Sequence, residues 1–336
     1  MSVRRFFGGA WGQRIVILAL IFAVMAVAEP KFFTGSNASS VLFAISIYGM
    51  MACGMLFVVL LGGLDLSVGS MAAVSACIVA QITMKSGYSG AGLLTGIVAA
   101  IAASIAVGVL HGLCVTYMRM PSFIVTLSTK YILYGVAPII TGGSFIYYPQ
   151  EMDSNSAVNF IYSLGNKRIA NVPMPVIFFA AVVVIAGFTL ASTTYGRRLY
   201  ALGGNPTASA LVGVRVRRDT VAAYVVSSLL AALSGIVLSS VNMQAGQTLA
   251  QGYEGSVLMA MIVGGINLAG GEGTISGAVF GALFAGLINN MMTLLSVPSD
   301  FQKAVQGAII LVAVCINAYS GRRAGRVKLP AAPAEK

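Results

Sequence analysis

Apolar runs of about 20 residues recur along the whole chain, and they restrict its fold more than any other feature. A helix of that length spans the hydrocarbon core of a bilayer, because it rises about 1.5 Å per residue. Only 9% of the 336 residues are charged, too few to cover a water-soluble globule. The sequence therefore predicts an all-α fold, a polytopic membrane helix bundle of about ten transmembrane helices. The runs lie at residues 15–34, 41–61, 68–84, 91–117, 122–141, 173–192, 220–241, 255–268, 274–296 and 302–320.

The 20 Lys and Arg residues fall in short clusters between these runs. This is the positive-inside pattern of membrane proteins and not a nucleic-acid-binding surface. With the N-terminus in the cytoplasm, ten spans place most of the basic residues on the cytoplasmic side and return the C-terminus to it. We expect one transmembrane domain over residues 1–320 and a basic cytoplasmic tail over 321–336. The start resembles a signal peptide, but Glu29 and Pro30 stand where a cleavage site would, which favours a retained first helix.

A glycine-rich stretch, Gly62 to Ser70, joins the second and third runs and carries Asp65, the one acidic residue between Glu29 and Glu151. A carboxylate at membrane depth costs roughly 2.5–3.5 kcal/mol on insertion scales, so it needs a partner or a function. One interpretation is that Asp65 caps the helix that begins near Leu66. The other is a functional role inside the membrane. Residues 264–269 repeat the pattern of residues 62–67 with Asn267 in place of Asp65.

No complete catalytic or metal-binding set is present in the sequence. His111 is the single histidine, and we expect it to pack inside the membrane with a hydrogen bond to a neighbouring helix. The four cysteines lie within apolar runs without metal-ligand spacing. No phosphate-binding G-x-x-x-x-G-K-[ST] loop occurs, so any ATP that drives this protein must bind another subunit. Because Asp65 is the only carboxylate expected at membrane depth, an intramembrane aspartyl protease is excluded.

The segment from Tyr195 to Val214 is the most specific signal in the chain, and we expect it in the cytoplasm. Asn205 is typical of a helix N-cap and Pro206 of the first helical position, and Gly213 can end a helix of about two turns. A helix this short is marginal alone and suits docking into a groove on a partner.

Four motifs give the chain a resemblance to a known family. They are Gly62-Gly63-Leu64-Asp65-Leu66-Ser67-Val68-Gly69, Pro121-Ser122-Phe123-Ile124-Val125-Thr126-Leu127, Ala201-Leu202-Gly203-Gly204-Asn205-Pro206 and Gly270-Gly271-Glu272-Gly273-Thr274. In this order they resemble the signatures of the permease subunit of ABC importers for ribose, xylose, arabinose, galactose and related monosaccharides. Lys130 departs from the family pattern because an apolar residue is expected there, and Phe301 and Gln306 stand where many relatives have Trp and Lys.

The resemblance implies a division of labour among subunits. A cytoplasmic ATPase subunit would bind ATP and Mg, a periplasmic sugar-binding protein would deliver the solute, and a second permease subunit, as a homodimer, would complete the path through the bacterial inner membrane. This chain would be a transport subunit without its own cofactor, metal or enzymatic activity. The ATPase-coupling residues would be Arg197, Gly203, Gly204, Asn205, Pro206, Ala208 and Gly213.

A path for a sugar should present hydrogen-bonding side chains, and its sites should be weak enough to release the solute. The candidates are Asp65, Ser67, Thr126, Asn289 and Asn290. For Thr126 the alternative is a bond within its own helix, and for the two asparagines it is bonding between helices.

Other transport functions remain open on the sequence alone. A related ABC permease for a nucleoside, polyol or sugar-derived signal shares these motifs. An ion-coupled secondary transporter would need no ATPase, but the scarcity of carboxylates inside the membrane argues against proton coupling.

Overall fold

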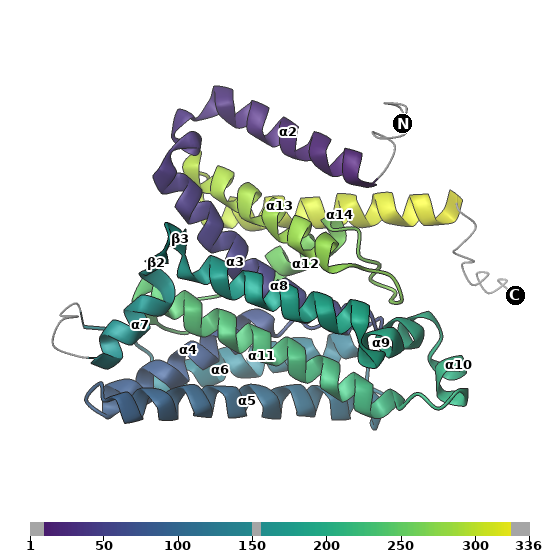
Figure 1. The fold of residues 1–336 in the computed structure, drawn as a ribbon, viewed down its shortest axis with the longest axis horizontal. Helices are drawn as coiled ribbons and strands as arrows, with labels where there is room; N and C mark the ends of the chain where they lie inside the picture. The colour runs from purple at the N-terminus through teal and green to yellow at the C-terminus, as the bar shows by residue number, and fades with distance from the viewer. Residues whose placement is uncertain (1–9, 150–155, 324–336) are drawn as a thin grey trace, which may run out of the picture.

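The computed structural model describes residues 10–149 and 156–323, and these are mostly helical (Figure 1). The long helices are α2 (Ala10–Ala28), α3 (Gly35–Val59), α4 (Val68–Lys85), α5 (Gly90–Thr116), α6 (Ser122–Thr141), α8 (Met174–Ser192), α11 (Val216–Asn242), α13 (Ile275–Leu294) and α14 (Ser299–Arg323). The shorter ones are η1 (Pro30–Phe33), α7 (Ser156–Asn166), α9 (Thr194–Gly204), α10 (Pro206–Leu211) and α12 (Tyr253–Val263). The predicted helix bundle is confirmed.

A helix occupies each of the ten places where the sequence predicts a span. Among the described residues, 7 helices are long and apolar enough to cross a membrane, namely α3, α4, α5, α6, α8, α11 and α13. The chain is therefore a multi-pass membrane protein. Ten crossings and cytoplasmic termini stay predictions, and nearly all of the basic tail expected over 321–336 lies outside the described residues.

Helix α12 is the shortest α-helix in a predicted span. Its 11 residues rise about 16 Å, roughly half the hydrocarbon thickness of about 30 Å. The chain enters this region as an irregular stretch over residues 246–252 and leaves it through the glycine-rich loop that follows Val263. The short run predicted at 255–268 is thus a half-length helix.

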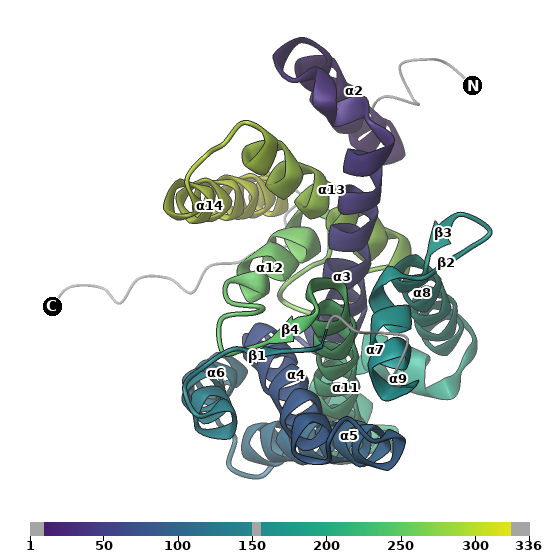
Figure 2. The ribbon, with the colours of Figure 1, turned by 90° about the vertical axis from the view of Figure 1, so that its left-hand side faces the viewer.

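The connection between α6 and α8 contains structure that the sequence does not predict. It carries β1 (Ile146–Tyr147), α7, β2 (Arg168–Ile169) and β3 (Val172–Pro173). Strand β2 pairs with β3, whereas β1 pairs with β4 (Gln244–Ala245), which follows α11, and both pairs are antiparallel. These elements lie at the end of the bundle opposite α9 and α10 (Figures 1 and 2).

Helix α3 passes through the middle of the bundle, and 83% of its membrane-spanning window is buried, against 22–28% for α5, α6 and α8 (Figure 2). Small residues allow the close helix packing. A Cβ atom at Gly108 or Gly112 of α5 would collide with α11, and one at Gly281 of α13 would collide with the backbone of Ala260. The four-residue glycine spacing therefore serves helix packing, as the sequence predicts.

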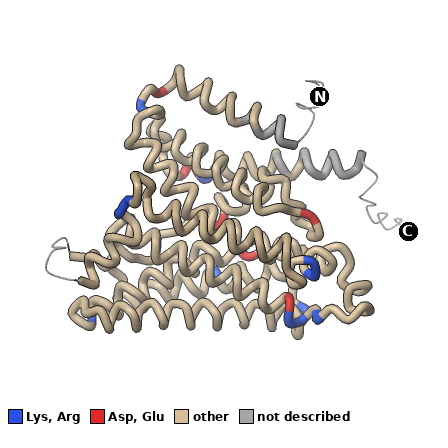
Figure 3. The backbone as a smooth tube through the Cα atoms, in the orientation of Figure 1, with Lys and Arg blue, Asp and Glu red and all other residues tan. Residues whose placement is uncertain are grey.

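Most of the described basic residues lie near the two ends of the molecule (Figure 3). Lys130 is different because it lies near the middle of α6. This clustering of basic residues at the ends is expected of a bundle that spans a membrane.

Candidate functional site

The predicted cytoplasmic segment forms two consecutive short helices, α9 and α10, at one end of the bundle (Figure 1). Asn205 is the N-cap of α10, and its Oδ1 accepts a hydrogen bond of 2.9 Å from the N–H of Ala208. Pro206 occupies the first helical position. Gly213 has a φ of +85°, which glycine adopts readily, and the chain turns there toward α11. The local structure predicted for this segment is confirmed.

The two arginines of this segment have different surroundings. Arg197 is exposed and donates to the Ser192 carbonyl oxygen at 3.5 Å. Arg198 pairs with the buried Asp219 at 3.4 Å, and the Tyr195 hydroxyl donates to the Asp219 carbonyl oxygen at 3.3 Å. Burial raises the pKa of Tyr195, so this hydroxyl stays a neutral donor at physiological pH. Asp219 fixes α9 to α11, a contact that the sequence does not reveal.

Three glycine-rich stretches, far apart in the sequence, meet at this end of the bundle. The N–H of Gly271 donates to the Leu60 carbonyl oxygen at 2.9 Å. A Cβ atom at Gly203 would collide with that carbonyl oxygen and with the backbone nitrogen of Gly271. The Tyr200 hydroxyl donates to the Gly273 carbonyl oxygen at 2.8 Å. The end of α9 therefore contacts both the loop before α4 and the loop before α13, backbone against backbone.

The loops before α4 and α13 share a turn. Asp65 Oδ1 accepts from the N–H of Ser67 at 3.0 Å, and Asn267 Oδ1 accepts from the N–H of Ala269 at 3.0 Å. The repeat read from the sequence thus has a structural counterpart at the acidic and amide positions. The two loops differ at their glycine pairs. The glycine with a positive φ is the first of the pair in the first loop, Gly62, but the second of the pair in the other loop, Gly265.

Asp65 is fully buried and has three hydrogen-bond donors. Its Oδ1 also accepts from the Ser67 hydroxyl at 2.6 Å, and its Oδ2 accepts from the Ser227 hydroxyl of α11 at 2.7 Å. Helix α4 begins at Val68 with Ser67 as its N-cap residue. Asp65 therefore orders the turn just before the helix and also ties it to α11.

His111 is fully buried beside this loop. Its ring packs edge-on against Tyr224 with 5.8 Å between centroids. Among the described residues neither ring nitrogen has a hydrogen-bond partner. The predicted packing role is confirmed, but the predicted hydrogen bond to a neighbouring helix is wrong because an aromatic ring occupies that side.

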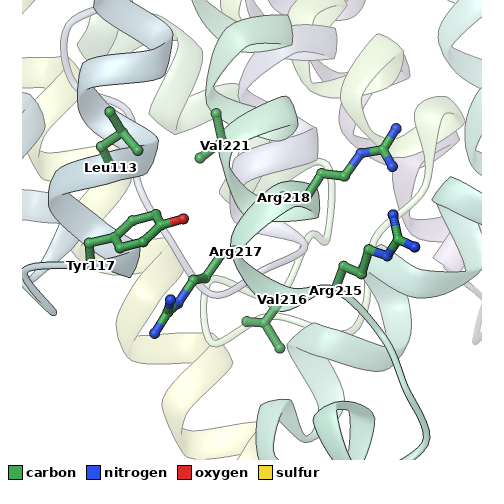
Figure 4. A pocket seen from close by; sticks show the side chains of 7 residues that line it. All are labelled: Leu113, Tyr117, Arg215, Val216, Arg217, Arg218 and Val221. Atoms are coloured by element: carbon green, nitrogen blue, oxygen red, sulfur yellow. The ribbon is translucent and has the colours of Figure 1, made fainter.

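Two cavities open at the same end. One of about 930 Å³ lies between the loops and α10, and Gly63, Arg119, Pro206 and Tyr224 are among its lining residues. The other, of about 560 Å³, lies between α5 and α11 (Figure 4). Arg217 there stacks over the Tyr117 ring at 4.5 Å. Such a cation and aromatic pair is suited to the polar headgroup region of a membrane.

The remaining path candidates separate into different environments. The Thr126 hydroxyl lies 2.9 Å from the Ser122 carbonyl oxygen of its own helix and 3.1 Å from that of Leu64. Asn290 exchanges hydrogen bonds of 2.7 and 3.1 Å with Asn37 of α3. Asn289 donates to the Ser256 hydroxyl at 3.1 Å and accepts from Gln306 at 2.7 Å. Of the two asparagines, only Asn289 bonds to the half-length helix α12.

Glu254 corrects the expectation that Asp65 is the only carboxylate at membrane depth. It is buried in the first turn of α12, and its Oε1 lies 2.7 Å from Nζ of Lys130. The Tyr134 hydroxyl lies 3.5 Å from its other oxygen. Apolar runs do not reveal Glu254, because it directly precedes the run assigned to 255–268. The unusual Lys130 within a span is the signal that points to an acidic partner.

A multi-pass helix bundle with a half-length helix, polar groups inside and a pair of short helices at one end is typical of membrane transport components. The profile of a family described as "branched-chain amino acid transport system / permease component" matches residues 37–314, and the chain belongs to this permease family.

Several curated relatives cover nearly the whole chain. The ribose import permease protein RbsC of Escherichia coli (strain K12) is 35% identical over 320 residues, 94% of this chain and 97% of the relative. The L-arabinose transport system permease protein AraH of the same strain is 35% identical over 319 residues, 93% and 92% of the two chains. RbsC of Bacillus subtilis (strain 168) is 33% identical over 301 residues, 89% and 90%. No solved structure matches the chain.

Proposed function

We propose that this chain is the permease subunit of an ATP-driven importer that carries a monosaccharide across the bacterial inner membrane. The names of the relatives support the substrate class, since they include ribose and L-arabinose permeases. A periplasmic binding protein delivers the sugar, and a cytoplasmic ATPase binds ATP and Mg. A second copy of the chain completes the path.

The contact of Gly203 with Leu60 and Gly271 is the observation that carries the mechanism. A force applied to α9 and α10 by the ATPase reaches two loops at once, and these loops begin α4 and α13. Because the contacts are between backbones, with no flexible side chains between them, a shift of α9 must move the loops or break the contact. The bundle then opens alternately to the binding protein and to the cytoplasm.

The ATPase binds at the exposed tip of α10 in this proposal. Leu211 and Val212 are 84% and 81% exposed, which suits insertion into an apolar groove of a partner. Of the coupling residues, Asn205 and Ala208 shape the start of α10 and Gly213 follows its end, whereas Arg197 lies in the first turn of α9.

Replacement of the tip tests the proposal. Leu211→Ser together with Val212→Ser should reduce co-purification of the ATPase and abolish ATP-dependent uptake of D-ribose and L-arabinose into proteoliposomes. Val172→Ser, an exposed change at the opposite end of the bundle, is the matched control and should leave both intact. Retention of ATPase binding and uptake by the tip variant would refute the coupling assignment. Failure of the unmodified complex to import either sugar would refute the substrate class.

A further inference from the structure

An ion pair connects two helices near the middle of the membrane. Lys130 lies about halfway along α6, and Glu254 lies in the first turn of the half-length helix α12. Nζ of Lys130 is 2.7 Å from Oε1 of Glu254. The Tyr134 hydroxyl, one turn along α6, lies 3.3 Å from the Ala250 carbonyl oxygen as well as near the carboxylate.

This pair is partly open to its surroundings. The side chain of Lys130 is 21% exposed and that of Glu254 is 9% exposed. Ionisable groups at this depth face a bundle interior or a water-filled cavity, because hydrocarbon does not solvate charge. The irregular stretch over 246–252 leads to the same point, and such backbone is tolerated inside a membrane only where protein buries it or water reaches it. Lys130 and Glu254 therefore lie where protein or water, and not hydrocarbon, has to surround them.

A second set of polar groups lies beside the pair. Asn289 bonds to Ser256, two residues beyond Glu254, and Gln306 of α14 bonds to Asn289. Gly255 lies between Glu254 and Ser256 in the chain, and a Cβ atom there would meet only the Gln306 side-chain oxygen, at 3.6 Å. The start of α12 is thus surrounded by donors and acceptors from four helices, namely Lys130, Tyr134, Glu254, Ser256, Asn289 and Gln306.

We propose that the Lys130–Glu254 pair is the solute-contacting point of the transport path and selects a neutral, polyhydroxylated solute. This inference rests on the proposed function. The ammonium group donates to solute hydroxyl oxygens and the carboxylate accepts from solute hydroxyl groups. Each charged group thus exchanges its ion-pair partner for a solute hydroxyl, and no proton is transferred. Because the two charges cancel, the site offers no net attraction to a sugar phosphate or a sugar acid.

Single neutral replacements test the contact. In proteoliposomes that contain the complete complex, Lys130→Met and Glu254→Gln should each lower uptake of the sugar carried by the unmodified complex, D-ribose or L-arabinose. We expect a loss of about tenfold or more, because a hydrogen bond to a charged group is worth at least that factor. Tyr134→Phe, which keeps its ring, should lower uptake less. Lys85→Met at the end of α4 is the matched control and should change nothing.

The same preparations distinguish a solute contact from a link between helices. Stimulation of ATP hydrolysis by the binding protein should stay within about twofold in the single variants, since the coupling segment is intact. The exchanged pair, Lys130→Glu with Glu254→Lys, remakes the ion pair with its donors and acceptors reversed, and its uptake should stay low. Full uptake by the exchanged pair would overturn the proposal and make the contact purely structural.

Chemical accessibility gives an independent readout. The thiol introduced by Lys130→Cys should react with a water-soluble methanethiosulfonate, mapped by peptide mass spectrometry, and the transported sugar should slow the reaction. A thiol that does not react would overturn the proposal because this side would then face lipid. If the unmodified complex imports neither sugar, the substrate class given under the proposed function is refuted. Normal import by the single variants would refute only the solute contact at Lys130 and Glu254.

Discussion

Asp65 shows how a single buried charge is accommodated in this bundle. Its carboxylate accepts from the Ser67 N–H, the Ser67 hydroxyl and the Ser227 hydroxyl. A buried carboxylate is tolerated when several donors replace its hydration. The same bonds join the start of α4 to α11, so the residue holds two helices together whether or not it also contacts solute.

Substitutions at Asp65 should therefore have graded effects. Asp65→Ala leaves the two serine hydroxyls and one N–H without their acceptor, which should cost about 1–3 kcal/mol and lower the thermal unfolding midpoint of the purified protein. Asp65→Asn keeps an acceptor toward Ser67 and should be milder. Ser227→Ala, which removes one donor, is the control. Equal unfolding midpoints for the Ala and Asn variants would contradict this account. Normal assembly of Asp65→Asn with complete loss of uptake would instead favour a charge-dependent role.

Neighbouring asparagines show what the sequence cannot distinguish. Asn289 and Asn290 are adjacent, and both lie in an apolar run. Successive residues of a helix point about 100° apart, so the two side chains meet different helices. Asn290 joins α3 through Asn37, whereas Asn289 joins α12 and α14. Residue type and spacing identify both as candidates, but only the placement of neighbouring helices separates them.

At the scale of elements, the junction of α9 with the two loops depends on backbone contact that only a glycine allows. Gly203→Ala would push its Cβ atom into Leu60 and Gly271, and overpacking of this kind costs about 1–3 kcal/mol. We expect lower ATP-dependent uptake with retained ATPase binding, because α10 is unchanged. Gly187→Ala in α8 is the control, since a Cβ atom there meets nothing within 4 Å and the residue lies outside the coupling segment. Similar uptake by the two variants would show that the junction does not transmit motion.

The packing of α5 on α11 should be equally sensitive. A Cβ atom at Gly112 would collide with the backbone and side chain of Val221, whereas one at Gly187 of α8 meets nothing within 4 Å. Gly112→Leu should therefore separate the two helices and destabilise the fold by about 1–3 kcal/mol or more. The yield of monodisperse protein in detergent should fall as a result. Gly187→Leu should behave like the unmodified protein. Size-exclusion chromatography compares the two variants, and equal profiles would argue against a packing role for Gly112.

Local signals predict the elements far better than they predict the contacts between them. Apolar runs mark the helices, and Asn205, Pro206 and Gly213 fix the bounds of α10, because these effects act within a few residues. Helix α7 and the two-residue ladders leave no comparable pattern. Glu254 directly precedes the apolar run at 255–268, so the apolar pattern does not show that it lies inside the bundle. The meeting of the loops around Gly203 depends on chain segments far apart in the sequence, which no local pattern encodes.

At the scale of the whole molecule, the positive-inside rule relates the charge of each connection to one face of the membrane. The segment that holds α9 and α10 carries Arg197 and Arg198, and three more arginines follow it, at positions 215, 217 and 218. The opposite end carries fewer basic residues, among them Lys85, Lys167 and Arg168. The bundle should therefore insert with α10 in the cytoplasm.

Thiol labelling in intact cells tests this orientation, and protease treatment of the same cells tests the number of crossings. Val212→Cys in the coupling segment and Met118→Cys between α5 and α6, both highly exposed, should react with a membrane-impermeant maleimide only after permeabilisation. Ile169→Cys at the other end should react in intact cells. A protease-cleavable tag fused to each terminus should stay intact in whole cells treated with external protease if α2 and α14 both cross. Each thiol is compared with the unmodified protein, whose native cysteines give the background. Labelling of Ile169→Cys and Val212→Cys from the same side would contradict the orientation, and cleavage of either terminal tag in intact cells would reduce the number of crossings below ten.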